Sequence, residues 1–77
     1  MKIACSKDYY DFRIYINNIL YLQIFLDNYD GIQSYFEGSK KPNYFIDIYR
    51  KTGEPIKLGF DDKKMWESIL KLIDENL

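Results

Sequence analysis

The sequence predicts an α+β domain: an antiparallel meander sheet of four to five strands with one C-terminal helix packed on one face. Apolar and aromatic residues alternate with a period of two through most of 9–60, which is the pattern of half-buried strands. Turn signals built on Asn, Asp and Gly separate these segments, and after residue 60 the apolar spacing changes to three and four. The 77 residues contain no linker-like stretch, so 1–77 is expected to form a single domain.

Two strands are expected over residues 9–16 and 19–27, joined by a turn at Asn17-Asn18, because asparagine tolerates positive φ. The inward-facing residues of these strands are expected to be Tyr10, Phe12, Ile14, Ile16, Leu20, Leu22, Ile24 and Leu26. A helix over 9–26 is the alternative, since this stretch is also apolar at several helical spacings. Its density of β-branched and aromatic residues favours strands. Whether residues 1–8 add a strand is left open by the pattern.

The break at 28–31 is expected to form a three-residue hairpin loop with Gly31 as the left-handed bulge residue. In this register Phe25 lies opposite Tyr35, and the apolar faces of the two strands stay consistent. The polar segment 37–43 contains Gly and Pro and is expected to be a loop.

Another hairpin is expected from a strand at 44–50, a turn with Gly53 as the bulge residue, and a strand that ends at Phe60. The expected cross-strand pairs are Ile48 with Ile56, Ile46 with Leu58, and Tyr44 with Phe60. Each pair joins two apolar residues on the same face, which is how a half-buried hairpin is stabilised.

A helix is expected from Asp61 or Asp62 to the C-terminus, because either carboxylate can accept hydrogen bonds from the first free amides. Its apolar stripe comprises Met65, Trp66, Ile69, Leu72, Ile73 and Leu77. This stripe is expected to cover the aliphatic face of the sheet, with Trp66 as the largest anchor.

Aromatic side chains gather on the opposite face of the expected sheet, which no predicted helix covers. The chain has eight tyrosines, whose rings combine a large contact area, few rotatable bonds and a polar tip. Such a face, edged by mixed charges, is typical of protein interaction hot spots. The candidate partner-binding residues are Tyr15, Tyr21, Phe25, Tyr35, Phe45 and Tyr49.

Other occupants of this face remain open. A second copy of the chain could pack on it in a homo-oligomer, or residues 1–10 could cover it. Single-stranded nucleic acid or a small anionic ligand could stack on Tyr35 or Tyr49, with the Lys40-Lys41 loop supplying charge. Duplex nucleic acid is disfavoured, because a net charge of −1 without a basic stripe does not displace counterions. A structural subunit of a larger assembly is a further alternative.

The sequence carries no motif for catalysis, and neither a metal nor a cofactor is expected. There is no histidine, and the four glycines stand apart, so no phosphate-binding loop is present. The acidic pairs at 61–62 and 74–75 are expected to be a helix cap and a solvated terminus. Cys5, the only cysteine, lies near Lys7, which could activate its thiol; the favoured interpretation is a small apolar filler or an unremarkable free thiol.

Together these features predict a non-enzymatic protein-binding module that acts by occupying the surface of a partner protein. The N-terminal segment lacks a long apolar run, so we expect neither a signal peptide nor a membrane span, and a cytoplasmic location. The amino-acid composition is rich in Ile, Lys, Asn, Tyr and Phe, which is typical of proteins from AT-rich genomes. A small inhibitor encoded by a phage or mobile element is one concrete form of this hypothesis.

Overall fold

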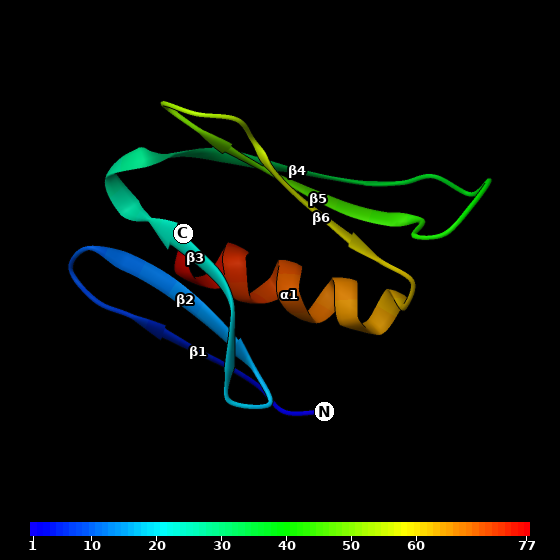
Figure 1. The fold of residues 1–77 in the computed structure, drawn as a ribbon, viewed down its shortest axis with the longest axis horizontal. Helices are drawn as coiled ribbons and strands as arrows, with labels where there is room; N and C mark the ends of the chain where they lie inside the picture. Colours follow the sequence, from blue (N-terminus) through cyan, green and yellow to red (C-terminus); the bar gives the residue numbers. More distant parts are fainter.

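The computed structural model describes residues 1–77 and contains two three-stranded antiparallel sheets and one helix (Figure 1). Sheet A comprises β1 (Ile3–Lys7), β2 (Asp11–Ile16) and β3 (Ile19–Phe25). Sheet B comprises β4 (Tyr29–Phe36), β5 (Tyr44–Arg50) and β6 (Ile56–Phe60). A short 3-10 turn, η1 (Leu26–Asn28), connects the sheets, and helix α1 (Lys63–Asn76) follows β6. The α+β class with a C-terminal helix is as expected, whereas two sheets replace the expected single meander.

The chain leaves sheet A at η1 instead of folding back in a tight hairpin. Asn28 explains this path, because its side chain binds the turn between β5 and β6. Its Oδ1 accepts from the Thr52 amide at 2.9 Å, and its Nδ2 donates to the Thr52 carbonyl at 3.1 Å. The Lys51 amide also donates to the Asn28 carbonyl at 2.8 Å. These bonds fasten the start of β4 beside the end of β5, and β4 pairs with β5 but not with β3.

The register of β4 therefore differs from the sequence-based expectation. Phe25 pairs with Asp11 inside sheet A, and Tyr35 pairs with Phe45 inside sheet B, so the expected pairing of Phe25 with Tyr35 is wrong. Gly31 has the positive φ of a bulge residue, 123°, but the bulge interrupts the β4–β5 ladder and does not form a hairpin loop.

The hairpin between β5 and β6 is confirmed in register. The pairs are Ile48 with Ile56, Ile46 with Leu58, and Tyr44 with Phe60. Gly53 has φ 93° in the connecting turn, and the Arg50 guanidinium lies where a side chain at this position would project. Arg50 also donates from Nε to the Glu54 carbonyl at 2.8 Å, so it closes the turn.

Sheet A shows three features that the alternating pattern did not predict: a bulge, an added first strand and a later start of the second strand. Asn17 and Asn18 do form the β2–β3 turn, with φ values of 50° and 67°. Directly after the turn, however, Tyr21 is an extra residue in a bulge, because Tyr15 pairs with Leu20 while Ile14 pairs with Leu22. Leu20 is consequently 49% exposed instead of facing the core.

The other two features concern the N-terminal end. Residues 3–7 form β1, which pairs along β2. Because β1 occupies the edge of sheet A, residues 1–10 do not cover the aromatic face of sheet B. The second strand begins at Asp11 and not at residue 9, so Tyr10 lies in the β1–β2 turn and is 73% exposed.

One hydrophobic core joins both sheets to the helix, which lies along their inner faces (Figure 1). The core residues are Phe12, Ile14, Leu22, Ile24, Ile46, Ile48, Phe60, Ile69 and Ile73. The Asp62 carboxylate caps α1 by accepting from the Lys64 amide at 3.0 Å, as one of the two expected caps. The helix, with 14 residues, lacks the length and apolar character that crossing a membrane requires.

Candidate functional site

The outer face of sheet B carries Tyr35, Phe45 and Tyr49, which all point away from the core. The strand register places these residues on the same side of β4 and β5, with Tyr35 directly opposite Phe45. The rings of Tyr35 and Phe45 stack at 5.1 Å between centroids with an interplanar angle of 20°. All three side chains are only partly buried. We call this surface, with its polar neighbours Gln33, Asp47 and Lys57, the sheet B outer face.

Polar neighbours hold the tyrosine rings of this surface in place. The Tyr49 hydroxyl donates to Gln33 Oε1 at 2.8 Å, and the Tyr35 hydroxyl donates to Asp47 Oδ1 at 3.4 Å. The Tyr35 hydroxyl and the Asp47 carboxylate also raise the pKa of the Lys57 ammonium, since both favour its charged form. The sheet B outer face therefore presents aromatic rings whose orientations are largely set before any partner arrives.

One loop residue packs against this surface. Pro42, in the expected loop 37–43, lies over Gly59 on β6, where a Cβ would come within 2.9 Å of the Pro42 Cγ. The same Cβ would lie 3.4 Å from the Phe45 ring. Gly59 thus creates the space in which the loop packs beside Phe45 and extends the apolar surface at one end.

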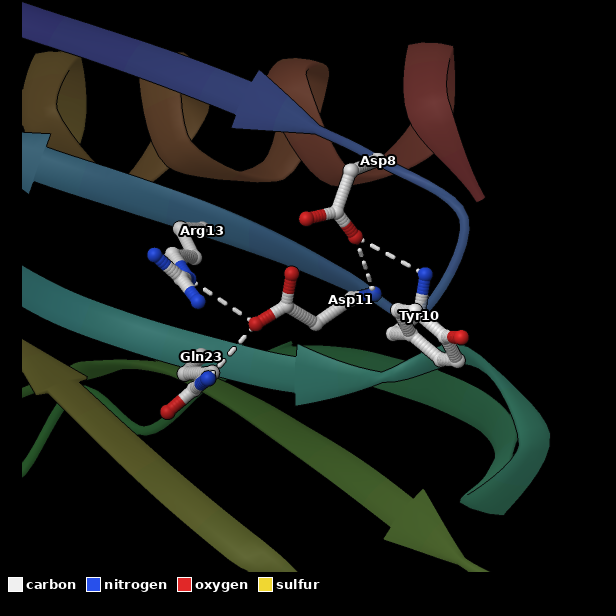
Figure 2. Close-up of polar contacts among 5 residues, drawn as sticks. All are labelled: Asp8, Tyr10, Asp11, Arg13 and Gln23. Atoms are coloured by element: carbon white, nitrogen blue, oxygen red, sulfur yellow. Dashed lines mark hydrogen bonds and ion pairs between the residues drawn. The ribbon is translucent and has the colours of Figure 1, made fainter.

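The outer face of sheet A carries a polar cluster formed by Asp11, Arg13 and Gln23 (Figure 2). Asp11 is 4% exposed, and its Oδ2 accepts from Arg13 Nε at 2.8 Å and from Gln23 Nε2 at 2.6 Å. The Tyr15 hydroxyl and the Asp11 carboxylate raise the pKa of the Arg13 guanidinium above its usual range. A buried carboxylate with these partners fixes β2 against β3 and has a structural role.

A hollow lies at the end of sheet A where β3 meets η1. Its lining residues are Tyr9, Tyr10, Phe25 and Asp27. We call it the aromatic hollow. The sequence pattern missed Tyr9 and Tyr10 as site residues, because the period-two alternation of β2 continues through them. The signal against a strand was Asp8, whose carboxylate accepts from the amides of Tyr10 at 2.8 Å and Asp11 at 3.0 Å in a side-chain-mediated turn (Figure 2).

The candidate residues are therefore distributed over different surfaces and do not form one aromatic face. Tyr35, Phe45 and Tyr49 lie together on the sheet B outer face. Tyr15 lies in the polar cluster of sheet A, and Phe25 lines the aromatic hollow.

Tyr21 is the candidate whose position differs most from the expectation. The bulge turns its ring toward Phe60 of the core, at 6.5 Å between centroids. Burial raises the pKa of the Tyr21 hydroxyl above its ordinary value. Its ring thus contributes to the junction between the two sheets.

No family model, curated protein or solved structure matches this chain.

The remaining reactive side chains have structural partners. Cys5 is exposed, and the neighbouring Lys7 ammonium donates to the Asn76 carbonyl at 2.7 Å, at the end of α1. Asp62 is the helix cap. No group of three or more Cys, Asp or Glu side chains is arranged to hold a metal ion.

Proposed function

We propose that the protein is a non-enzymatic binding module that docks the sheet B outer face on the surface of another protein. The observation that carries this proposal is the set of three aromatic rings, half-exposed on one sheet face. The hydroxyls of both tyrosines are hydrogen-bonded to neighbours on the same face. Tyrosine and phenylalanine anchors of this kind are enriched at interaction hot spots.

Preorganisation favours this surface as a binding site. Association orders side chains, and ordering each flexible one costs about 0.5–1.5 kcal/mol. The stacked pair Tyr35–Phe45 and the Tyr49–Gln33 hydrogen bond have already restricted these rings in the free protein. A partner therefore gains their contact area at a reduced entropic cost.

The charges around the rings favour a protein over a polyanion. Asp47 and Lys57 form one acidic and one basic position on the face, and they lie directly opposite each other in the β5–β6 pairing. The exposed Lys40-Lys41 pair lies in the loop and is not part of a basic stripe. Nucleic-acid binding depends on many such cations, so the observed balance gives it little support.

The experiment is affinity capture from a lysate of the native host, with and without nuclease, followed by mass spectrometry. The test variant is the double substitution Tyr35→Ala and Tyr49→Ala. The matched control is Phe36→Ala, because Phe36 also lies on β4 and is exposed, but on the opposite face. We expect a nuclease-resistant protein that the control retains and the double variant loses, with an affinity reduced by at least about tenfold.

Three outcomes would overturn the proposal. Capture that the double variant leaves intact would place the contact elsewhere on the molecule. Recovery that disappears with nuclease, together with an affinity that falls steeply between about 50 and 200 mM salt, would identify a nucleic acid as the ligand. A dimer of the purified chain that dissociates in the double variant would make a second copy the occupant of the face. Circular dichroism of each variant distinguishes these outcomes from simple unfolding.

A further inference from the structure

The aromatic hollow is assembled from two chain segments that backbone hydrogen bonds hold together. Tyr9 and Tyr10 come from the β1–β2 turn, and Phe25 and Asp27 come from the end of β3 and from η1. The Leu26 amide donates to the Tyr10 carbonyl at 2.9 Å, which joins the two segments directly beside the hollow. The backbone that carries the rings is therefore fixed on both sides.

Three aromatic rings line the hollow. Tyr9 and Tyr10 meet edge to face, at 77° between planes and 5.3 Å between centroids, and Phe25 supplies a third ring. The hollow has a volume of about 420 Å³, within the range of small-ligand sites. The three side chains are 88%, 73% and 54% exposed, so they contribute little to the core. Their arrangement is available for a ligand.

The electrostatic character of the hollow is negative. The exposed faces of aromatic rings carry partial negative charge, and the Asp27 carboxylate on the rim has no ion pair. Asp8 also has no ion pair, and the amides of Asp11 and Tyr10 lower the pKa of its carboxyl, so it stays ionised at neutral pH. The lining residues include no cationic side chain, and the Arg13 guanidinium, which follows the turn on β2, is paired with Asp11.

We propose that the aromatic hollow binds a methylated ammonium group, such as a quaternary ammonium ligand or a trimethylated lysine side chain. A cation over aromatic faces is attracted by the ring quadrupole, and aromatic cages for methylated ammonium groups use this attraction. A primary ammonium fits less well, because its three N–H donors would lose water while Asp27 is the only charged acceptor among the lining residues. A methylated ammonium has no such donors to satisfy.

The direct test is a titration of the full chain, followed by NMR amide shifts, with choline, a trimethyllysine peptide and the same peptide with unmodified lysine. The neutral carbon isostere of choline, 3,3-dimethylbutanol, serves as the ligand-side control. We expect choline and the trimethyllysine peptide to shift the amides of residues 9–10 and 25–27. The unmodified peptide and the neutral isostere should bind at least about threefold more weakly, since they lack either the methyl groups or the charge.

Variants of the chain test the same site from the protein side. Phe25→Leu keeps an apolar side chain but removes a ring, and Asp27→Asn removes the charge; each should weaken choline binding about three- to tenfold. Phe36→Leu is the matched control, because Phe36 is exposed to a similar degree, 56% against 54% for Phe25, and lies outside the hollow. It should bind choline like the unaltered chain.

The proposal is overturned if the affinity of the hollow does not depend on the charge or the methylation of the ligand. Equal affinity for choline and its neutral isostere would make the hollow a simple apolar site. Equal affinity for both peptides, or shifts that Phe25→Leu leaves unchanged, would equally exclude the assignment. Because the ligand-side comparison uses the unaltered chain, it holds even if a variant fails to fold. The site is separate from the sheet B outer face, so either proposal can fail without the other.

Discussion

Sheets A and B share the same strand number and antiparallel order, but they are attached to the helix by different contacts. On sheet B, the Trp66 indole donates from Nε1 to the Phe45 carbonyl at 3.0 Å, and the Trp66 ring packs 5.1 Å from the Tyr44 ring. On sheet A, the Lys7 ammonium reaches the Asn76 carbonyl at the exposed C-terminal end of α1. Beyond the core that both sheets share, sheet B thus has a packed, partly buried anchor on the helix, whereas sheet A has an exposed polar contact.

The outer faces of the two sheets differ in the same way. Sheet B displays rings whose hydroxyls are hydrogen-bonded within the sheet, so its surface has one defined shape. Sheet A uses its outer face for the buried Asp11 cluster, and its most exposed rings line the aromatic hollow at the end of the sheet. This contrast underlies the two proposals, a docking surface on sheet B and a cation site on sheet A.

The largest expected effect is the loss of stability on truncating a core residue, which tests whether the two sheets fold as one unit. Phe12 of sheet A and Ile46 of sheet B are both fully buried in the shared core. Phe12→Ala should lower the free energy of unfolding by about 3–5 kcal/mol, through lost burial and the cavity left behind. A core of this size supplies only about 3–5 kcal/mol, so the variant should be largely unfolded. Far-UV circular dichroism and urea titration measure this loss.

The matched variant Ile46→Ala, with an expected cost of about 2–5 kcal/mol, tests the same core from sheet B. If the shared core makes folding cooperative, either substitution abolishes the protection of amides in both sheets against hydrogen exchange. Amides of sheet B that stay protected in Phe12→Ala would show that the sheets unfold separately. The two sheets would then not be parts of one cooperative folding unit.

The accuracy of the sequence-based expectations also differed between the sheets. The hairpin of β5 and β6 was predicted in full register, because Gly53 marks the turn and every apolar residue has an apolar partner. Tyr35, Phe45 and Tyr49 were placed on one outer face because strict alternation holds along β5, and along β4 beyond the bulge at Gly31, and so determines the direction of each side chain.

The structure of sheet A was predicted wrongly where a side-chain hydrogen bond or a bulge interrupts the alternation of faces. Asp8 ends the strand pattern by binding two amides, and the bulge at Tyr21 reverses the faces of Leu20 and Tyr21. At the junction of the two sheets, Asn28 binds Thr52, which lies far away in the sequence. Such long-range side-chain contacts leave no periodic trace, so the aromatic hollow could not be found from the pattern alone.

An intermediate effect is expected from the helix anchor on sheet B. Trp66→Phe keeps an aromatic ring but removes the Nε1–H donor to the Phe45 carbonyl, which should lower the free energy of unfolding by about 1 kcal/mol. Lys7→Met, which removes the exposed contact from sheet A to Asn76, should cost less. Urea titrations of both variants give the comparison. If Lys7→Met costs as much as Trp66→Phe, the two sheets are attached to the helix equally strongly, contrary to the asymmetry described above.

The smallest expected effect concerns Tyr21, the ring that the bulge directs to the junction of the sheets. Burial raises the pKa of its hydroxyl above the usual value of about 10, so the folded chain keeps this proton at a pH where the unfolded chain loses it. The resulting stability is fully present below pH about 10 and is lost as the pH rises toward the pKa of the folded state. The same sign applies to Tyr29 at the start of sheet B, whose pKa is raised by burial and by the Asp74 carboxylate.

The near-ultraviolet absorbance of tyrosinate measures this difference in the folded chain. Tyr21→Phe should remove amplitude from the late part of the titration curve and reduce the loss of stability above pH about 10. Tyr29→Phe should act in the same direction, which gives one reporter in each sheet. A Tyr21→Phe curve that loses only its early part would mean that this ring is solvated, and that the bulge does not direct it against Phe60 at the junction of the sheets.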